Sequence, residues 1–141
     1  MNREHLYRAK RKNWRKSFNK EWIEGYYVKI GDNHFILTAH AANEGFIEDF
    51  EIDSDIVCEY TGLQDKDGTK IFEGDIVRRI DLHNVKEPSA GFIEYDTENT
   101  SFLIHWVDIQ NYSATFPWKD RIKVIGNVFD NPELLKGGNG E

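Results

Sequence analysis

Between Tyr60 and Val77 the sequence reads YTGLQDKDGTKIFEGDIV, in which three glycines separate short apolar runs. The Asp67-Gly68 pair is typical of a tight turn, because glycine readily adopts the positive φ that such turns need. A strand is expected from Asp75 to about Ile80. The segment therefore predicts turns and short strands, and its apolar residues are expected in a core: Ile71, Phe72, Ile76 and Val77.

The glycines of this segment do not form a known ligand loop. A phosphate-binding loop needs four residues between its glycines and a lysine before the threonine, whereas here five residues separate Gly62 from Gly68 and Lys70 follows Thr69. A calcium loop places glycine at its sixth position, but Gly68 is fourth when counted from Asp65. A structural turn is the better interpretation.

Upstream, residues 22–38 read as a β-hairpin. Both parities of residues 22–30 are largely apolar, a turn cluster follows at 31–33, and Phe35 to Thr38 resume strand chemistry. Residues 5–10 alternate in the same way and can pair with 22–28 through a loop at 11–20. Residues 39–57 are predicted as a loop, a short strand near 46–52 and a turn of helix after Asp53, where Asp53-Ser54 offers capping oxygens.

Downstream, three further strands are expected at 91–95, 102–107 and 122–129, with a hairpin turn at 96–99. Residues 82–90 are a polar connection. Asn131 and Pro132 begin a single capped helical turn, and residues 137–141 are a disordered tail. Many short strands with regular turn signals predict a barrel or sandwich, and the composition agrees, because isoleucine outnumbers leucine two to one.

Composition excludes several classes of protein. The chain has 141 residues, 39% of them hydrophobic, which suffices for a folded core of one domain or two small subdomains. A single cysteine, Cys58, excludes a disulfide framework and predicts a small buried residue in a reducing compartment. No segment resembles a signal peptide or a membrane span, so a cytoplasmic location in the host cell, without membrane contact, is expected.

The net charge of −7 is unevenly divided: residues 1–20 carry +7 and the rest of the chain −14. Several of these basic residues lie close to Trp14 in the sequence. Together they form a candidate contact surface for an anionic partner, made of Lys10, Arg11, Lys12, Trp14, Arg15 and Lys16. Cations could neutralise phosphates while Trp14 and Phe18 stack on bases. Alternatively this is a solvated hairpin loop with both rings folded onto the protein, or a contact with the acidic face of another subunit.

No constellation of catalytic or metal-binding residues is recognisable. The histidines, among them His34, His40, His83 and His105, lack ligand spacing, and Cys58 has no basic neighbour in sequence to activate it. The serines lack a nucleophile elbow. We therefore expect no enzyme, no catalytic residues, no cofactor and no metal.

Three segments resemble the YopX family of phage and prophage proteins. They are residues 60–77, residues 124–135 (VIGNVFDNPELL), and Tyr7 to Lys10 together with Glu21 to Tyr26 near the start. The basic segment at 10–20 departs from the family, where a shorter turn would be expected between the paired strands. Any function in that loop would be particular to this member.

The resemblance implies an all-β fold of two small barrel-like subdomains and no established activity. We expect a β subdomain at 1–57, with the basic hairpin loop at about 10–20, and an SH3-like subdomain at 58–136. A phage-derived protein that acts by protein–protein association, as a homo-oligomer or a binder of a host factor, is then the leading hypothesis. The alternative is a nucleic-acid-associated accessory protein that uses the basic loop.

Overall fold

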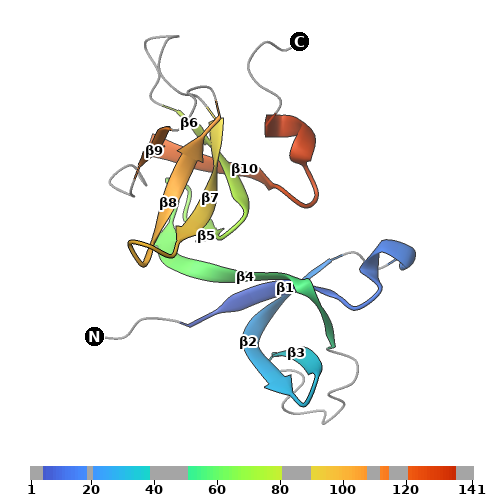
Figure 1. Ribbon diagram of the computed structural model, residues 1–141. Coiled ribbons are helices and arrows are strands. Elements are labelled where there is room, and N and C mark those ends of the chain that lie inside the picture. The colour runs from blue at the N-terminus through green and yellow to red at the C-terminus, as the bar shows by residue number, and fades with distance from the viewer. Residues whose placement is uncertain are drawn as a thin grey trace. The chain divides into compact units, whose positions relative to one another are not determined.

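The computed structural model describes residues 5–18, 21–38, 51–80, 90–107, 112–114 and 121–135 (Figure 1). The predicted all-β fold is confirmed: within these ranges ten strands form two antiparallel sheets, and the only helices there are short 3-10 turns. The chain divides into two compact units, residues 1–60 and 61–141. None of the described helices has the length and hydropathy to cross a bilayer.

The first unit is built from β1 (Tyr7–Arg11), β2 (Trp22–Ile30), β3 (Asn33–Leu37) and the start of the long strand β4 (Ile52–Gln64), with the 3-10 helix η1 (Trp14–Lys16) after β1 (Figure 1). The predicted pairings are confirmed: β1 runs antiparallel to β2, with Tyr7 opposite Gly25, and β2 forms a hairpin with β3. On its other side β1 pairs with β4.

The core of the first unit lies on one face of this sheet. Ala9, Ile23, Ile36 and Ile52 are buried together there. Because side chains alternate between the faces of a strand, Ile23 and Ala9, which are directly opposite in the register, must point to the same side. The alternation of apolar residues therefore fixes which face of β1 and β2 is buried. This in turn positions the basic loop that connects the two strands.

The helical turn predicted after Asp53 is wrong, because β4 is continuous from Ile52 to Gln64. Ile56 and Cys58 are buried along the strand, and β1 offers an open edge for its main-chain hydrogen bonds. The side chain of Asp53, which suggested a helix cap, accepts a hydrogen bond from the main chain of Asp55 instead. The strand predicted near 46–52 and the connection at 82–90 lie largely outside the described residues, as does the tail at 137–141.

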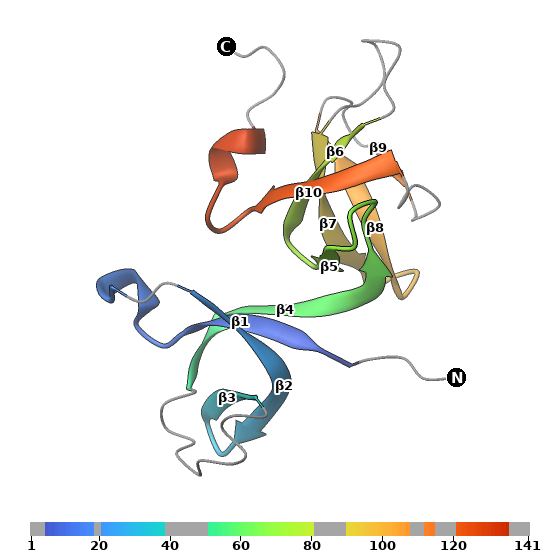
Figure 2. The same ribbon diagram turned by 180° about the vertical axis from the view of Figure 1, so that it is seen from behind.

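The second unit contains β5 (Lys70–Phe72), β6 (Asp75–Arg79), β7 (Ala90–Asp96), β8 (Ser101–Trp106), β9 (Tyr112–Ala114), β10 (Ile122–Asn127) and the 3-10 helix η4 (Pro132–Leu135) (Figure 2). Five of its strands form one antiparallel sheet in the order β10-β6-β7-β8-β9, the curled meander expected of an SH3-like barrel. Its core comprises Ile71, Val77, Ile93, Phe102, Ile104, Trp106 and Ile122.

Two buried aspartates in the Tyr60–Val77 segment accept hydrogen bonds from the main chain. Asp65 is buried, and its carboxylate accepts hydrogen bonds from the main-chain N–H groups of Asp67, Thr69 and Val124, which ties the turn to β10. Asp75 is also buried and accepts a hydrogen bond of 2.8 Å from the N–H of Phe72. Both buried carboxylates thus satisfy main-chain N–H donors.

The C-terminal helical turn is confirmed as η4, but Asn131 does not cap it through its side chain. The Asn131 side-chain oxygen accepts a hydrogen bond from the main-chain N–H of Asn127, and Asn127 in turn accepts hydrogen bonds from the N–H groups of Phe129 and Asp130. The two asparagines therefore close the turn between β10 and η4.

Candidate functional site: the basic loop

The basic loop, residues 12–18, begins with a sharp turn at Asn13. Asn13 adopts a left-handed conformation (φ 62°), which asparagine tolerates better than most residues. The turn is closed by main-chain hydrogen bonds from Lys16 to Asn13 and from Ser17 to Trp14. The main-chain N–H of Lys12 also donates to the carbonyl of Glu51, so the loop starts as an extension of the β1–β4 pairing.

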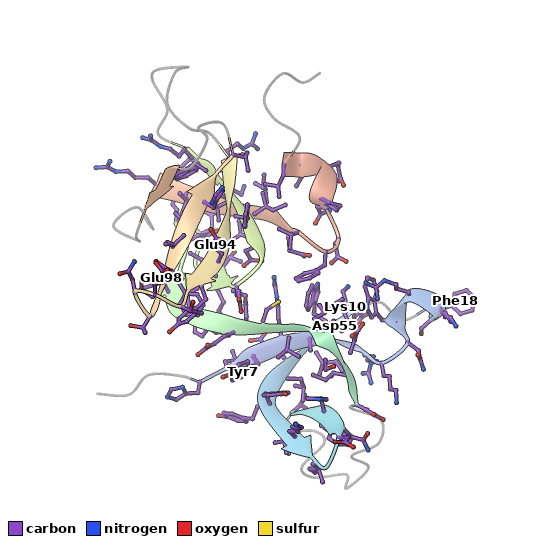
Figure 3. The ribbon with its side chains drawn as sticks, in the orientation of Figure 1. Tyr7, Lys10, Phe18, Asp55, Glu94 and Glu98 are labelled. Atoms are coloured by element: carbon purple, nitrogen blue, oxygen red, sulfur yellow. The ribbon has the colours of Figure 1, made fainter. Side chains whose placement is uncertain are left out.

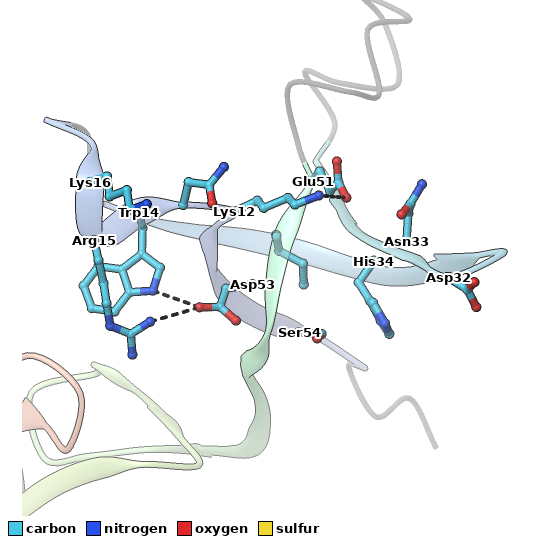
Figure 4. A pocket seen from close by; sticks show the side chains of 12 residues that line it. Lys12, Trp14, Arg15, Lys16, Asp32, Asn33, His34, Glu51, Asp53 and Ser54 are labelled. Atoms are coloured by element: carbon cyan, nitrogen blue, oxygen red, sulfur yellow. Dashed lines mark hydrogen bonds and ion pairs between the residues drawn. The ribbon is translucent and has the colours of Figure 1, made fainter.

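Side chains of the loop bind carboxylates at and just before the start of β4. The Trp14 indole donates a hydrogen bond of 3.1 Å to Oδ2 of Asp53, and the Arg15 guanidinium approaches the same oxygen at 3.4 Å (Figure 4). Lys12 forms an ion pair of 3.2 Å with Glu51. The positive loop is therefore docked on acidic residues of its own chain.

The rings of Trp14 and Trp22 are engaged by cations. Lys10 is buried, with Nζ 5.0 Å from the ring centroid of Trp14 and 4.7 Å from that of Trp22. The guanidinium of Arg15 lies 4.7 Å from the Trp14 centroid, and that of Arg8 lies 4.4 Å from the Trp22 centroid. This cation–π ladder links β1, β2 and the loop, and such contacts stabilise most when they are shielded from water.

A polar pocket of about 370 Å³ lies beside the loop (Figure 4). Three segments line it: the loop at 12–16, residues 32–34 at the β2–β3 turn and the start of β3, and residues 51–54 at and just before the start of β4. Lys16 and Asp32 lie at opposite sides of the pocket (Figure 4). The lining carries both signs of charge, so the pocket suits a polar partner better than an apolar ligand.

The structure brings together most of the residues predicted as an anionic-partner contact. Lys12, Trp14, Arg15 and Lys16 line the pocket, whereas Lys10 is buried in the cation–π ladder and the half-buried Arg11 lies on β1 opposite Ile52. The two predicted rings differ: Trp14 is folded onto β4, but Phe18 is fully exposed. Phe18 lies at the end of the basic loop with its ring in solvent (Figure 3).

Sequence reasoning missed the carboxylates that hold the loop. Asp53 lies 39 positions after Trp14, and Glu51 lies 39 positions after Lys12. The one signal was the charge division between the first 20 residues and the remainder of the chain, which suggests internal pairing but names no partner.

Within the described ranges, no group of three or more His, Cys, Asp or Glu side chains is placed to hold a metal ion. Nδ1 of His34 lies 2.6 Å from the hydroxyl of Tyr27, and Nδ1 of His105 lies 3.0 Å from Glu94. Cys58, the single cysteine of the sequence, is a buried thiol that forms no disulfide. These side chains make structural contacts.

The fold and the loop define a class: small all-β proteins of two barrel-like units, here with a mixed-charge pocket beside a docked basic loop. The chain belongs to the YopX family, whose model, described as YopX protein, matches residues 6–136.

The chain is similar to solved structures, and one of these matches it over almost its full length. It is the crystal structure of protein EF1440 from Enterococcus faecalis, with a TM-score of 0.53 and 22% identity over 94% of this chain and 97% of that one. At that identity the likeness establishes the fold alone. No curated protein sequence matches the chain.

Proposed function

We propose that this protein is not an enzyme and acts by protein–protein association, with a second copy of itself as the principal partner. The observation that carries the proposal is the fully exposed ring of Phe18 on a loop whose base is fixed by the Trp14–Asp53 hydrogen bond. Aromatic side chains are enriched at the centres of protein interfaces. A fixed loop presents such a side chain at little cost in conformational entropy.

Binding of nucleic acid is the less favoured function. Lys12 and Arg15 each lie beside a carboxylate, and the ring of Trp14 already contacts Lys10 and Arg15. Strong nucleic-acid binding needs cations that can neutralise phosphates and rings that can stack on bases. The loop therefore has fewer cations and rings available for nucleic acid than its sequence suggests.

We further propose a phage or prophage origin and a location in the host cytosol. The origin rests on the family resemblance of residues 60–77 and 124–135. The location rests on Cys58, because a single cysteine outside any disulfide is typical of proteins from reducing compartments.

Light scattering coupled to size-exclusion chromatography tests the proposal. The wild-type protein should elute as a defined multiple of 16.5 kDa at micromolar concentration. Phe18→Ser should reduce the associated fraction, whereas Leu134→Ser, which replaces an exposed apolar residue in η4, should leave it unchanged. A wild-type protein that stays monomeric at every concentration tested would refute self-association.

A further inference from the structure

The basic loop carries a positive charge, at the rim of its pocket, that no described side chain pairs with. The Lys16 side chain is exposed and has no hydrogen-bond or ion-pair partner among the described residues. Lys12 and Arg15 are paired, but their side chains are 58% and 68% exposed, so one side of each cation still faces solvent. We name these three residues, Lys12, Arg15 and Lys16, the basic rim.

A surface of the opposite charge lies on the second unit, at the hairpin between β7 and β8. Its hollow, about 450 Å³, is lined by Glu94, Tyr95, Asp96, Thr97, Glu98 and Leu103, with no basic side chain among them. Glu94 and Glu98 are labelled in Figure 3. The Asp96 carboxylate accepts hydrogen bonds from the main-chain N–H of Glu98 and from Asn99, which fixes the turn. We name residues 94–98 the acidic hairpin.

Two features of the acidic hairpin match the basic rim. The Glu98 carboxylate, like the Lys16 ammonium, has no partner among the described side chains and is exposed. The ring of Tyr95 is exposed as well, and its edge-on contact with Phe102, at 5.1 Å between centroids, holds it in place. An exposed ring therefore accompanies the charges on both surfaces, Tyr95 on one and Phe18 on the other.

We propose that the acidic hairpin of one copy docks against the basic rim of a second copy, with Glu98 paired to Lys16. This inference rests on the proposed function and names its interface. The two surfaces differ, so the contact is heterologous, and each copy carries one of each; such contacts produce rings or open filaments. Because the charges are exposed, association should weaken as salt rises and the Debye length falls from about 10 Å at 0.1 M to about 3 Å at 1 M.

Charge reversal of Lys16 and Glu98 tests the pairing. Lys16→Glu alone would face Glu98 with a like charge, and Glu98→Lys alone would face Lys16, so each variant should associate about tenfold more weakly than wild type. An equimolar mixture of the two variants should associate again, because the carboxylate introduced at position 16 of one variant then meets the ammonium introduced at position 98 of the other. The double variant K16E/E98K should self-associate like the wild type.

Matched controls separate this pairing from a simple change of net charge. Lys29→Glu on β2 and Glu133→Lys on η4 make the same charge changes at other exposed positions and should leave association unaltered. Light scattering and sedimentation velocity at about 50 mM and about 500 mM salt provide the readout, a range over which screening of exposed charges changes strongly.

The outcomes distinguish the two proposals. A monomeric wild type at low salt overturns self-association and this interface together. A wild-type oligomer that persists in both single variants overturns only the interface, as does a mixture of the two that stays dissociated. Restoration in the mixture and in the double variant supports the assigned pair.

Discussion

The Trp14 indole donates a hydrogen bond of 3.1 Å to Asp53, although the two residues lie 39 positions apart. Trp14 belongs to the loop that follows β1, and Asp53 to the start of β4. The same carboxylate also receives Arg15 at 3.4 Å. One acidic side chain therefore holds both an aromatic and a basic member of the loop, which makes Asp53 the anchor of the candidate site.

Replacing Trp14 by Phe should loosen the loop while keeping an aromatic ring. The variant loses the N–H donor to Asp53, and a hydrogen bond to a charged acceptor contributes about 1.5–3 kcal/mol when shielded, less here because the contact is only part-buried. We expect a loss of about 1 kcal/mol in the free energy of unfolding. Urea titration measures this loss, and faster tryptic cleavage after Arg15 and Lys16 reports the loosened loop.

A double-mutant cycle with Asp53→Asn isolates the contact. The two substitutions should be non-additive by about 1 kcal/mol, since either one alone weakens the same hydrogen bond. Asp55→Asn is the matched control, because Asp55 is exposed and its carboxylate has no partner among the described residues. Strict additivity of W14F and D53N would show that the hydrogen bond contributes nothing.

Asp65→Ala should destabilise the protein far more than its neighbour Asp67→Ala. The first change leaves three main-chain donors without their acceptor, whereas the Asp67 side chain is half exposed and only approaches Lys123 at 3.9 Å. We expect losses of about 3 kcal/mol and less than about 0.5 kcal/mol. Thermal and urea unfolding measure both, and equal losses would contradict the role assigned to Asp65.

Gly91→Ala should disturb the centre of the second sheet. A methyl group there would lie 2.7 Å from the carbonyl oxygen of His105 and 3.0 Å from the Trp106 ring. Gly91 is opposite Trp106 in the β7–β8 register, so relief requires a shift of paired strands. The cost should be about 1–3 kcal/mol. Ser101→Ala in β8 is the control, and an unchanged melting temperature for Gly91→Ala would contradict the close packing.

The sequence predicted the features that depend on residues close together along the chain. Alternation identified β1, β2 and their pairing, and Asp67-Gly68 marked a turn in which Gly68 has a φ of +84°. The role of Asp53 could not be predicted locally, since beside Ser54 it reads as a helix cap, yet its side chain binds a residue 39 positions away. The strand β9 was missed because three residues carry too little alternation to be recognised.

The same limit applies to the candidate site. The sequence identified the cations and Trp14 because they are neighbours along the chain. It could not show that Lys10 is buried between two rings, or that Lys12 faces Glu51, because those contacts depend on how β1, β2 and β4 align. A basic segment that is exposed to solvent and one that is paired with carboxylates of its own chain can have the same composition.

The last prediction concerns nucleic acid. At about 150 mM salt, single-stranded DNA should give no gel shift with the wild-type protein at low micromolar concentration, because the loop cations lie beside carboxylates and the net charge is −7. The comparison variant K12E/R15E/K16E should then behave like wild type. A gel shift by the wild-type protein would contradict this prediction. If the K12E/R15E/K16E variant abolishes the shift, the K29E control retains it, and the affinity falls steeply with salt, then the loop binds phosphates. In that case Glu51 and Asp53 would be displaced from Lys12 and Arg15 on binding, and Asp53→Asn, by removing that competition, should strengthen the shift.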